Sequence, residues 1–334
     1  MTSFRVQRMT LSGRVALVLC ALAIGAIVAM PWWASQGLIR DVVTLACYIA
    51  VAQMWNMLAG YGGLVSVGQQ AFVGVAAYAM FVMAQTLGVN PFVAVGLSMI
   101  APAILAVPTY ALLHRLEGPY FAIGTWVMAE AMRLVATNMP LVNGGAGMSL
   151  RVMTQFSADQ RAVAASLLAA LLLLVTMGGS YLLLRSRYGI ALTAMRDNPV
   201  AAQSQGVDVQ RLRFLIFLAA AVGSGFAGSV YFMAQLRITP PSAFDMNWAN
   251  LAIFIVMIGG IGSLEGVLIG AVIYFFADRW FGEFGASYLI VLGLLTLVCA
   301  LYFREGLWGL SRRVVDAPWF PTRRTLVQTE GDRA

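Results

Sequence analysis

The sequence contains no lysine, and its 334 residues include one histidine and three cysteines. A Walker A loop places a lysine on the nucleotide phosphates, and a Schiff-base cofactor needs a lysine amine. The chain therefore cannot hold a P-loop ATPase site or a pyridoxal cofactor. With His114 alone, a metal site made of several histidines is also excluded. Cys20, Cys47 and Cys299 lie in apolar runs without CxxC spacing, as is typical of small buried hydrophobic residues.

Charged residues are also scarce, at 10% of the chain against about 25% in a typical soluble domain. Hydrophobic residues make up 60%, and the mean hydropathy is +0.82. Because so few charges cannot cover a water-facing surface, a soluble fold is excluded and an all-α polytopic membrane protein is predicted. The net charge of +7 comes from arginines beside apolar segments. This pattern indicates membrane topology and contact with lipid rather than nucleic-acid binding.

Apolar stretches long enough for membrane helices recur along the chain. A hydrocarbon core of about 30 Å needs about 20 apolar residues per helix. The first stretch follows Arg5, Arg8 and Arg14 and lacks a convincing cleavage site, so we interpret it as a retained signal-anchor helix. The stretches cover residues 15–31, 42–59, 64–86, 92–113, 120–138, 162–184, 212–234, 248–277 and 286–303.

The stretch from Trp248 to Ala277 decides the number of spans. It is about 30 residues long, and glycines interrupt it at 259–263, each weakening a helix interior by about 1 kcal/mol. A broken helical pair gives about ten helices and puts the arginines of both termini in the cytoplasm, as the positive-inside rule favours. Two full spans or a re-entrant hairpin would both fit residues 249–277. The predicted regions are a cytoplasmic N-terminus (1–14), one transmembrane domain (15–303) and a cytoplasmic tail (304–334).

The loop 185–213 contains the signals of a short, separately capped helix. Asn198 is a good N-cap, Pro199 fits the first helical position, and Gly206 fits the position after the C-cap. The helix between them has under two turns and is too short to be stable alone. A solvated connection is one interpretation. The tight capping favours a helix braced against a cytoplasmic partner, with Arg196 and Asp197 at its entrance.

Four segments resemble the LivM-type permeases of the branched-chain amino acid subfamily of ABC importers. The segment from Arg187, RYGIALTAMRDNPVAAQSQGVDVQRLRFLIFLAAAVGSGFAGSVY, resembles their cytoplasmic loop and following helix. Three further segments occur in the family's order. They are GGLVSVGQQAFVGVAAY from Gly62, GPYFAIGTWVMAEAMRLV from Gly118 and IGGIGSLEGVLIGA from Ile258.

The sequence also departs from the family at a few positions. Pro199 stands where glutamate is common, Gln69 where histidine is frequent, and Asn143 begins a segment that is commonly Thr-Gly-Gly. These differences leave the substrate open, because the subfamily includes permeases for urea and short amides.

The resemblance implies an ABC importer permease fold and an import function. The expected substrate is a branched-chain or related small apolar amino acid, carried across the bacterial inner membrane. The chain would pair with a LivH-like permease and two cytoplasmic ATPase subunits, and an extracytoplasmic binding protein would deliver the substrate. The chain itself would bind no cofactor and would not be an enzyme, since ATP and Mg²⁺ would sit on the ATPases. The expected ATPase-coupling residues are Arg196, Asp197, Asn198, Pro199, Ala202 and Gly206.

Candidate residues for the translocation pathway lie at helix breaks and intramembrane charges. Half-helix ends with free backbone groups can line a substrate route. Glu130 is essentially the one intramembrane carboxylate that the pattern offers, and Arg133 lies three residues on, where the two can pair. A structural ion pair and a substrate contact are both open interpretations. Glu265 is expected at the interface, near the hairpin turn. The pathway candidates are Gly62, Gly63, Ser66, Gln69, Tyr120, Phe121, Glu130, Gly259, Gly260 and Gly262.

Other function classes fit less well. An ion-coupled secondary transporter predicts several intramembrane carboxylates, and a membrane enzyme needs a constellation of catalytic groups. Neither explains the capped cytoplasmic helix. Two outward segments, Met139–Gln160 and Gln235–Asn247, are predicted to receive the binding protein, with docking shared by the partner permease.

Overall fold

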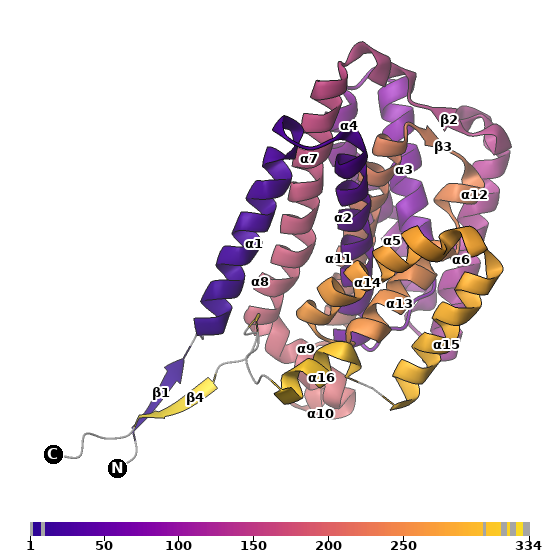
Figure 1. The fold of residues 1–334 in the computed structure, drawn as a ribbon. Coiled ribbons are helices and arrows are strands. Elements are labelled where there is room, and N and C mark those ends of the chain that lie inside the picture. Colours follow the sequence, from indigo (N-terminus) through magenta and orange to yellow (C-terminus); the bar gives the residue numbers. More distant parts are fainter. Residues whose placement is uncertain (1–2, 8–10, 303–304, 315–318, 321–324, 330–334) are drawn as a thin grey trace.

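The chain folds into a bundle of long helices, described here by a computed structural model of residues 3–7, 11–302, 305–314, 319–320 and 325–329 (Figure 1). This architecture confirms the all-α polytopic prediction. The helices are α1 (Leu11–Ala29), α2 (Gln36–Asn56), α3 (Gln69–Gln85), α4 (Pro91–Leu97), α5 (Ile100–Leu113), α6 (Pro119–Asn138), α7 (Ala158–Leu173), α8 (Gly179–Arg185), α9 (Arg187–Asp197), α10 (Pro199–Ser204), α11 (Val209–Gln235), α12 (Pro240–Ala243), α13 (Asn247–Gly259), α14 (Leu264–Phe281), α15 (Ala286–Tyr302) and α16 (Gly306–Val314).

Within the described residues, six helical segments are long and apolar enough to cross a membrane. The remaining predicted stretches correspond to α3, α6, α14 and α15, which do not meet both the length and the apolarity of a full span. The number of crossings, about ten, therefore stays a prediction. The six segments are 12–32, 36–61, 91–113, 158–185, 209–235 and 240–259.

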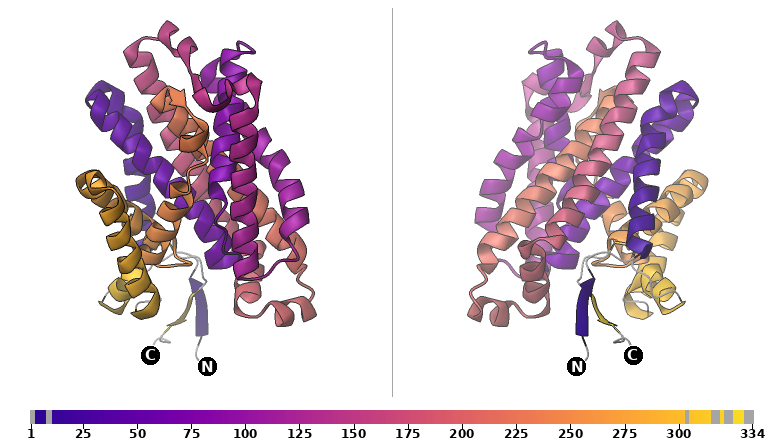
Figure 2. Two further views of the ribbon diagram at one scale, coloured as in Figure 1. Left: turned by 90° about the vertical axis from the view of Figure 1, so that its right-hand side faces the viewer. Right: turned by 90° about the vertical axis from the view of Figure 1, so that its left-hand side faces the viewer.

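The two ends of the chain lie together at one end of the bundle. Strand β1 (Ser3–Gln7) pairs antiparallel with β4 (Thr325–Thr329), and both views of Figure 2 show the pair beyond the helices. Figure 1 shows α9, α10 and α16 at this same end. An arrangement with both termini on one side of the membrane needs an even number of crossings, which agrees with the predicted topology.

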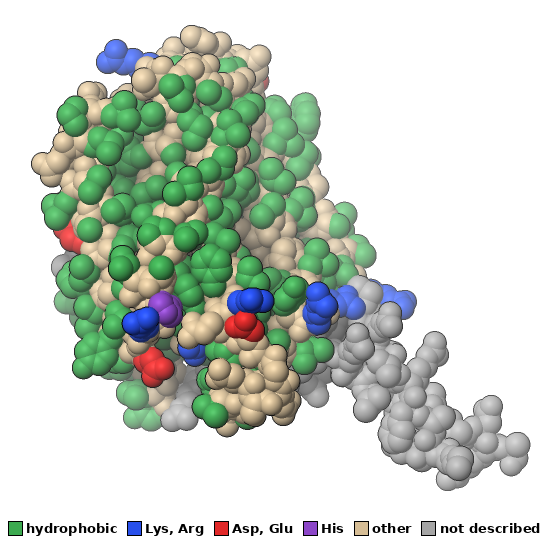
Figure 3. All heavy atoms as spheres, turned by 180° about the vertical axis from the view of Figure 1, so that it is seen from behind, with side chains coloured by type: hydrophobic (Ala, Val, Ile, Leu, Met, Phe, Trp, Pro, Cys, Tyr) green, Lys and Arg blue, Asp and Glu red, His purple; other side chains and the backbone are tan. Residues whose placement is uncertain are grey.

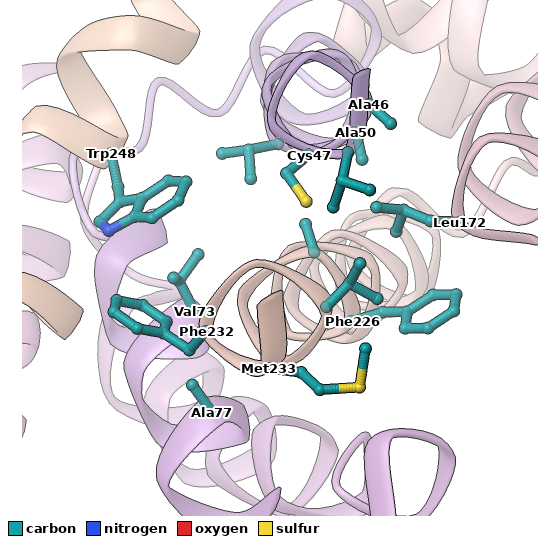
Figure 4. Packing of buried hydrophobic residues seen from close by; sticks show 14 of the residues in the cluster. Ala46, Cys47, Ala50, Val73, Ala77, Leu172, Phe226, Phe232, Met233 and Trp248 are labelled. Atoms are coloured by element: carbon teal, nitrogen blue, oxygen red, sulfur yellow. The ribbon is translucent and has the colours of Figure 1, made fainter. Parts of the chain in front are cut away.

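Helix α11 runs through the centre of the core and packs against α2 and α3 (Figure 4). Small residues of α11 allow this close approach. A Cβ on Gly228 would lie 2.4 Å from the carbonyl oxygen of Val73, and one on Gly225 would lie 2.9 Å from the Cβ of Ala76. A hydrogen bond of 2.7 Å between the Ser98 and Ser229 hydroxyls adds a buried polar contact.

The outer surface of the bundle suits a lipid environment. On the face shown in Figure 3, hydrophobic side chains cover most of the height of the helices, and most charged side chains gather at the lower end. Leu112 of α5 and Leu182 of α8 are 77% and 69% exposed. In water such a surface would be an unusually large apolar patch, whereas lipid solvates it.

Among the irregular segments that interrupt the long helices, two lie near the end that holds the termini. Helix α2 continues as a π-helical turn, Met57–Tyr61, and residues 62–68 are then non-helical as far as α3. Residues 260–263 form the turn between α13 and α14, so the predicted helix break is confirmed. With 13 residues, α13 spans about 20 Å, and it reaches the length of a candidate membrane span only together with the segment that contains α12. These two breaks hold most of the predicted pathway glycines.

Candidate functional site

The predicted coupling helix is α10, and its caps are the ones that the sequence indicates. The Asn198 side chain accepts a hydrogen bond of 3.0 Å from the Ala201 backbone N–H, and Pro199 begins the helix. After it, Gly206 adopts a φ of +86°, a conformation that favours glycine. Asp208 then caps α11 by accepting from the Arg211 N–H at 3.0 Å. The predicted local structure is therefore confirmed.

Helix α10 exposes one side and buries the other. Val200 is 77% exposed, whereas Ala202 is 3% exposed and packs in a cluster with residues of α9 and α11. Arg196, Asp197, Asn198 and Pro199 are also exposed, at the junction of α9 with α10. An exposed apolar side chain on a short capped helix at the charged end of the molecule is a suitable contact for a partner protein.

A separate helix, α9, precedes α10 and was not predicted. Ser186 caps it by accepting a hydrogen bond of 3.1 Å from the Tyr188 N–H. Gly189 is packed so closely that a Cβ there would lie 1.9 Å from the Leu184 carbonyl oxygen. The chain therefore bends sharply between α8 and α9, and the segment before α10 is a helix rather than an open loop.

Arg196 connects the coupling segment to the turn of the α13–α14 hairpin. Its guanidinium group lies against Gly262, where a Cβ would be 2.5 Å from Nη1 of Arg196. Gly262 has a φ of +75°, so both conformation and crowding require glycine. Two predicted sets, the coupling residues and the hairpin glycines, thus meet at this contact.

The end of α2 holds the same turn from the other side. The Asn56 side chain accepts a hydrogen bond of 2.8 Å from the Gly262 N–H and donates one of 3.0 Å to the Ser263 carbonyl. The Tyr61 hydroxyl donates to the Gly262 carbonyl at 2.7 Å. Gly60 completes the contact, since a Cβ there would lie 2.7 Å from the Gly262 nitrogen. We call residues 56–62, 196 and 260–263 the turn junction.

Other segments of the chain also pack against the hairpin turn. A Cβ on Gly259 would lie 1.9 Å from the Gly266 carbonyl oxygen, and one on Gly260 would lie 2.4 Å from the Glu305 carbonyl oxygen. Glu265 is 5% exposed and accepts a hydrogen bond of 2.8 Å from the Phe320 N–H. The expectation of an interfacial Glu265 is therefore wrong, because residues that follow α15 fold back over the turn.

The non-helical segment 62–68 passes between α2 and α6. Trp55 donates from Nε1 to the Ser66 carbonyl at 2.7 Å, and the Val67 N–H donates to the Thr125 hydroxyl at 3.0 Å. Gln69 is buried at the start of α3 and accepts from the Ser224 hydroxyl at 3.0 Å. The contacts of Trp55 and Thr125 supply partners for backbone groups that leave the helical ladder, as a membrane interior requires.

Gly62 and Gly63, at the start of this segment, have different surroundings. A Cβ on Gly62 would lie 2.2 Å from Cδ1 of Ile216, whereas the space around Gly63 is open and its φ is +66°. Gly62 therefore permits close packing on α11, and Gly63 permits the left-handed backbone of the turn.

The α6 candidates lie apart from the turn junction. Tyr120 is 72% exposed, whereas Phe121 is buried and its ring lies 6.2 Å from that of Phe217. Arg133 donates from Nε to both carboxylate oxygens of Glu130, at 3.0 and 2.9 Å, which confirms the predicted pair. The pair is partly exposed, with 43% and 32% of the Glu130 and Arg133 side chains accessible. It therefore faces outward from the bundle of this single chain.

The two outward segments lie side by side at the end of the bundle opposite α10. Strand β2 (Met148–Ser149) pairs antiparallel with β3 (Arg237–Ile238). A Cβ on Gly147 would lie 2.1 Å from the Ile238 carbonyl oxygen, so the two strands approach closely. The predicted docking segments thus form one surface rather than two.

Residues 37–301 match the sequence model of a protein family described as "Branched-chain amino acid transport system / permease component". The chain belongs to this family. It is a permease component of the LivM type and a multi-pass membrane protein, not an enzyme. The match covers both irregular segments and α10, so the turn junction is part of the family's common domain.

Several curated relatives are similar over much of the chain. The high-affinity branched-chain amino acid transport permease LivM of Salmonella typhimurium is 25% identical, covering 89% of this chain and 75% of the relative. LivM of Escherichia coli is 24% identical over the same shares. A probable LivH permease of Methanocaldococcus jannaschii is 24% identical, covering 75% of this chain and 85% of the relative. No solved structure matches.

Three polar residues of this permease were missing from the sequence-based candidates. Asn56 and Tyr61 lie in or next to a predicted apolar stretch, and a polar residue in such a stretch is a signal that could have found Asn56. Asp278 lies near the end of α14 and lines a cavity, and the pattern of apolar stretches did not single it out. Asp278 follows directly after the predicted apolar stretch 248–277, so the hydropathy pattern gave no signal for it.

Proposed function

We propose that this chain is the permease subunit of an ATP-binding cassette importer for branched-chain or related small apolar amino acids. The observation that carries the proposal is the family match over residues 37–301, together with LivM relatives that align with 89% of the chain. The complex would lie in the bacterial inner membrane, with both termini in the cytoplasm. Separate subunits would hydrolyse ATP and bind its Mg²⁺.

In this proposal, α10 is the contact with an ATPase subunit. Its exposed Val200 would enter a cleft of the ATPase, and Arg196 would carry the displacement to the hairpin turn at Gly262. Asn56 and Tyr61 join that turn to the π-helical end of α2. A movement of α10 would therefore reach both helix breaks, and π-helical turns are frequent at functional sites.

The substrate route would run beside these helix breaks and between this chain and a LivH-like partner. Gly62, Gly63, Ser66 and Gln69 would contribute from the first break, and Gly259, Gly260 and Gly262 from the second. Tyr120 and the Glu130–Arg133 pair face outward on α6, where a second permease would shield the charges from lipid. Phe121 would support this face by packing within the chain.

A binding protein would dock on the surface that β2 and β3 join. Ser149 and Ser242 are both exposed on this surface, so cysteines there can report contact with a bound protein. With a short bifunctional crosslinker, both positions should yield an adduct with the co-expressed binding protein. Absence of an adduct from either site would contradict this docking surface.

A second candidate substrate is suggested by similarity to permeases of another import system. The autoinducer 2 import system permease LsrC of Klebsiella pneumoniae is 32% identical over 149 residues, which cover 40% of this chain. A permease for a small polar solute, such as autoinducer 2, urea or a short amide, is therefore the alternative. An ion-coupled secondary transporter is a more distant one.

Reconstitution tests the function directly. The chain, its LivH-like partner, both ATPases and the binding protein are placed in proteoliposomes, and uptake of leucine, isoleucine, valine, urea and autoinducer 2 is measured with and without ATP. ATP-dependent uptake of a branched-chain amino acid is the expected result. Uptake that follows a proton or sodium gradient without ATP would overturn the importer proposal. Uptake of urea or autoinducer 2 alone would overturn the proposal that the substrate is a branched-chain amino acid.

A further inference from the structure

A cavity of about 670 Å³ lies where α11 ends, so the length of that helix separates it from the coupling segment. Small-molecule sites commonly measure about 300–1,000 Å³ and combine apolar walls with a few polar groups. This cavity lies between α2, α11, α13, α14 and α15, and residues of β3 and α12 reach its rim. None of the residues proposed for coupling or for the pathway lines it.

Aromatic rings form much of the wall. Tyr231 and Trp248 meet edge to face at 4.9 Å between ring centroids, and Tyr48 contacts Tyr274 at 5.6 Å. Tyr288 completes this group from α15. Trp248, Tyr274 and Tyr288 are less than 10% exposed, so the rings belong to the floor of the cavity. Such a set of π faces attracts a cation within about 6 Å of a ring centroid.

Asp278 places a carboxylate in the same cavity. The Tyr48 hydroxyl lies within hydrogen-bonding reach of it. Among the described residues, the ion pairs are Glu130–Arg133, Asp208–Arg211 and Asp41–Arg279, so Asp278 has no cationic partner there. The neighbouring Arg279 is already held by Asp41 at 2.6 Å. A carboxylate without a cationic partner that lines a largely aromatic cavity is one of the few polar groups that orient a ligand in such a site.

We propose that this cavity binds a primary ammonium group against Asp278 and the surrounding aromatic rings. This assignment of the ligand rests on the proposed function: the group bound is the α-ammonium group of the transported amino acid. Trp248 and Leu251 supply apolar contact for the side chain of that amino acid. Arg237 lines the cavity as well and offers a guanidinium for a carboxylate. An aminophospholipid headgroup presents the same ammonium chemistry, so the test separates the two sources.

Saturation-transfer NMR tests the site on the assembled membrane complex in phosphatidylglycerol nanodiscs, without ATP or binding protein. The probes are leucine, isoamylamine, which keeps the ammonium group, and 4-methylpentanoate, which lacks it. Leucine and isoamylamine should receive saturation, and 4-methylpentanoate, which keeps only the contacts to Arg237 and to the apolar wall, should receive much less. Equal transfer to 4-methylpentanoate, or no transfer to either amine, would overturn the proposal. Displacement of leucine by added phosphatidylethanolamine would uphold ammonium binding and identify the lipid as its source.

The variant Asp278→Asn should weaken binding of both amines about tenfold or more, because a charge-assisted contact is lost. Glu283→Gln is the matched control, since Glu283 is an exposed acid near the end of α14 that does not line the cavity. Unchanged binding in Asp278→Asn would overturn the site. If that variant does not assemble, the comparison of the three probes on the wild-type complex decides whether the cavity binds an ammonium group. A complex that transports no branched-chain amino acid but binds isoamylamine through Asp278 would refute the proposed function and leave the ammonium site standing.

Discussion

Helix α14, which follows the hairpin turn, and the proposed coupling helix α10 have similar N-caps but opposite surroundings. Ser263 caps α14 by accepting from the Gly266 N–H at 3.2 Å, and Asn198 caps α10 by accepting from the Ala201 N–H at 3.0 Å. Around the first, Gly260 and Gly262 are crowded by backbone and by Arg196, whereas the space around Gly206 is open.

The difference indicates which of the two segments is available to a partner. The hairpin turn is fixed by hydrogen bonds and by glycines that leave no room for a side chain. Helix α10 is held by its caps and by one buried alanine, and it presents an exposed valine. Substitutions in the turn should therefore destabilise the fold, whereas those in the coupling segment should impair transport in a folded protein.

The largest effect is expected from Gly259→Ala. Its Cβ would lie 1.9 Å from the Gly266 carbonyl oxygen, and neither backbone can yield easily. Overpacking costs typically about 1–3 kcal/mol, and we expect the upper end or a failure to accumulate in the membrane. Thermal unfolding of the detergent-purified protein measures the loss. Gly96→Ala, which meets nothing within 4 Å, is the control, and an equal loss in both variants would contradict the packing argument.

The second largest loss of stability is expected from Asn56→Leu. It removes two hydrogen bonds and leaves the Gly262 N–H and Ser263 carbonyl without these partners, for a loss of about 2 kcal/mol in unfolding free energy. Asn56→Asp keeps the acceptor and should lose less. Asn138→Ala, which removes a bond only to the Leu134 carbonyl of its own helix, is the control. Thermal unfolding ranks the three variants by stability. A loss of stability in Asn138→Ala as large as that in Asn56→Leu would contradict the special role of the Asn56 contact with the turn.

In the coupling segment, Gly206→Pro and the double variant Arg196→Ala/Asp197→Ala should reduce ATP-dependent uptake about tenfold, equivalent to about 1.4 kcal/mol. Proline cannot adopt a φ of +86° and lacks the N–H that donates to the Gln203 carbonyl at 3.0 Å. Uptake, ATPase activity and membrane content are measured together.

Gly88→Pro is the control for this prediction, because Gly88 has a φ of +68° in open space at the C-terminal end of α3. It should retain uptake if its protein inserts. Full uptake with normal ATPase stimulation in both coupling variants would show that α10 is not the coupling helix.

The smallest effect is expected from breaking the Glu130–Arg133 pair. Because both side chains are partly exposed, the coupling between them in the single chain should be about 0.5 kcal/mol. A double-mutant cycle with Glu130→Gln and Arg133→Gln measures it by thermal unfolding. Co-purification with the LivH-like partner is measured in parallel. Normal recovery of the partner in both single variants would contradict the proposed contact on α6.

Local sequence signals predicted the elements whose interactions are also local. Asn198, Pro199 and Gly206 define α10 because each acts within a few residues of itself. The Glu130–Arg133 pair follows from its spacing on one helix, and the glycines at 259–263 break a helix wherever it is placed. The contact of Asn56 with the turn could not be predicted this way, because its partners lie 206 and 207 residues further along the chain.

The sequence by itself determined that the protein lies in a membrane, that it is helical, and that it lacks the lysine of a P-loop. Composition and short-range capping suffice for those conclusions. Only the tertiary structure brought Arg196 to Gly262, buried Glu265 beneath Phe320, and placed Asp278 among tyrosines from three other helices. Each of these contacts joins segments distant in the chain, and close packing of glycines and small residues, rather than periodicity, sets where such segments meet.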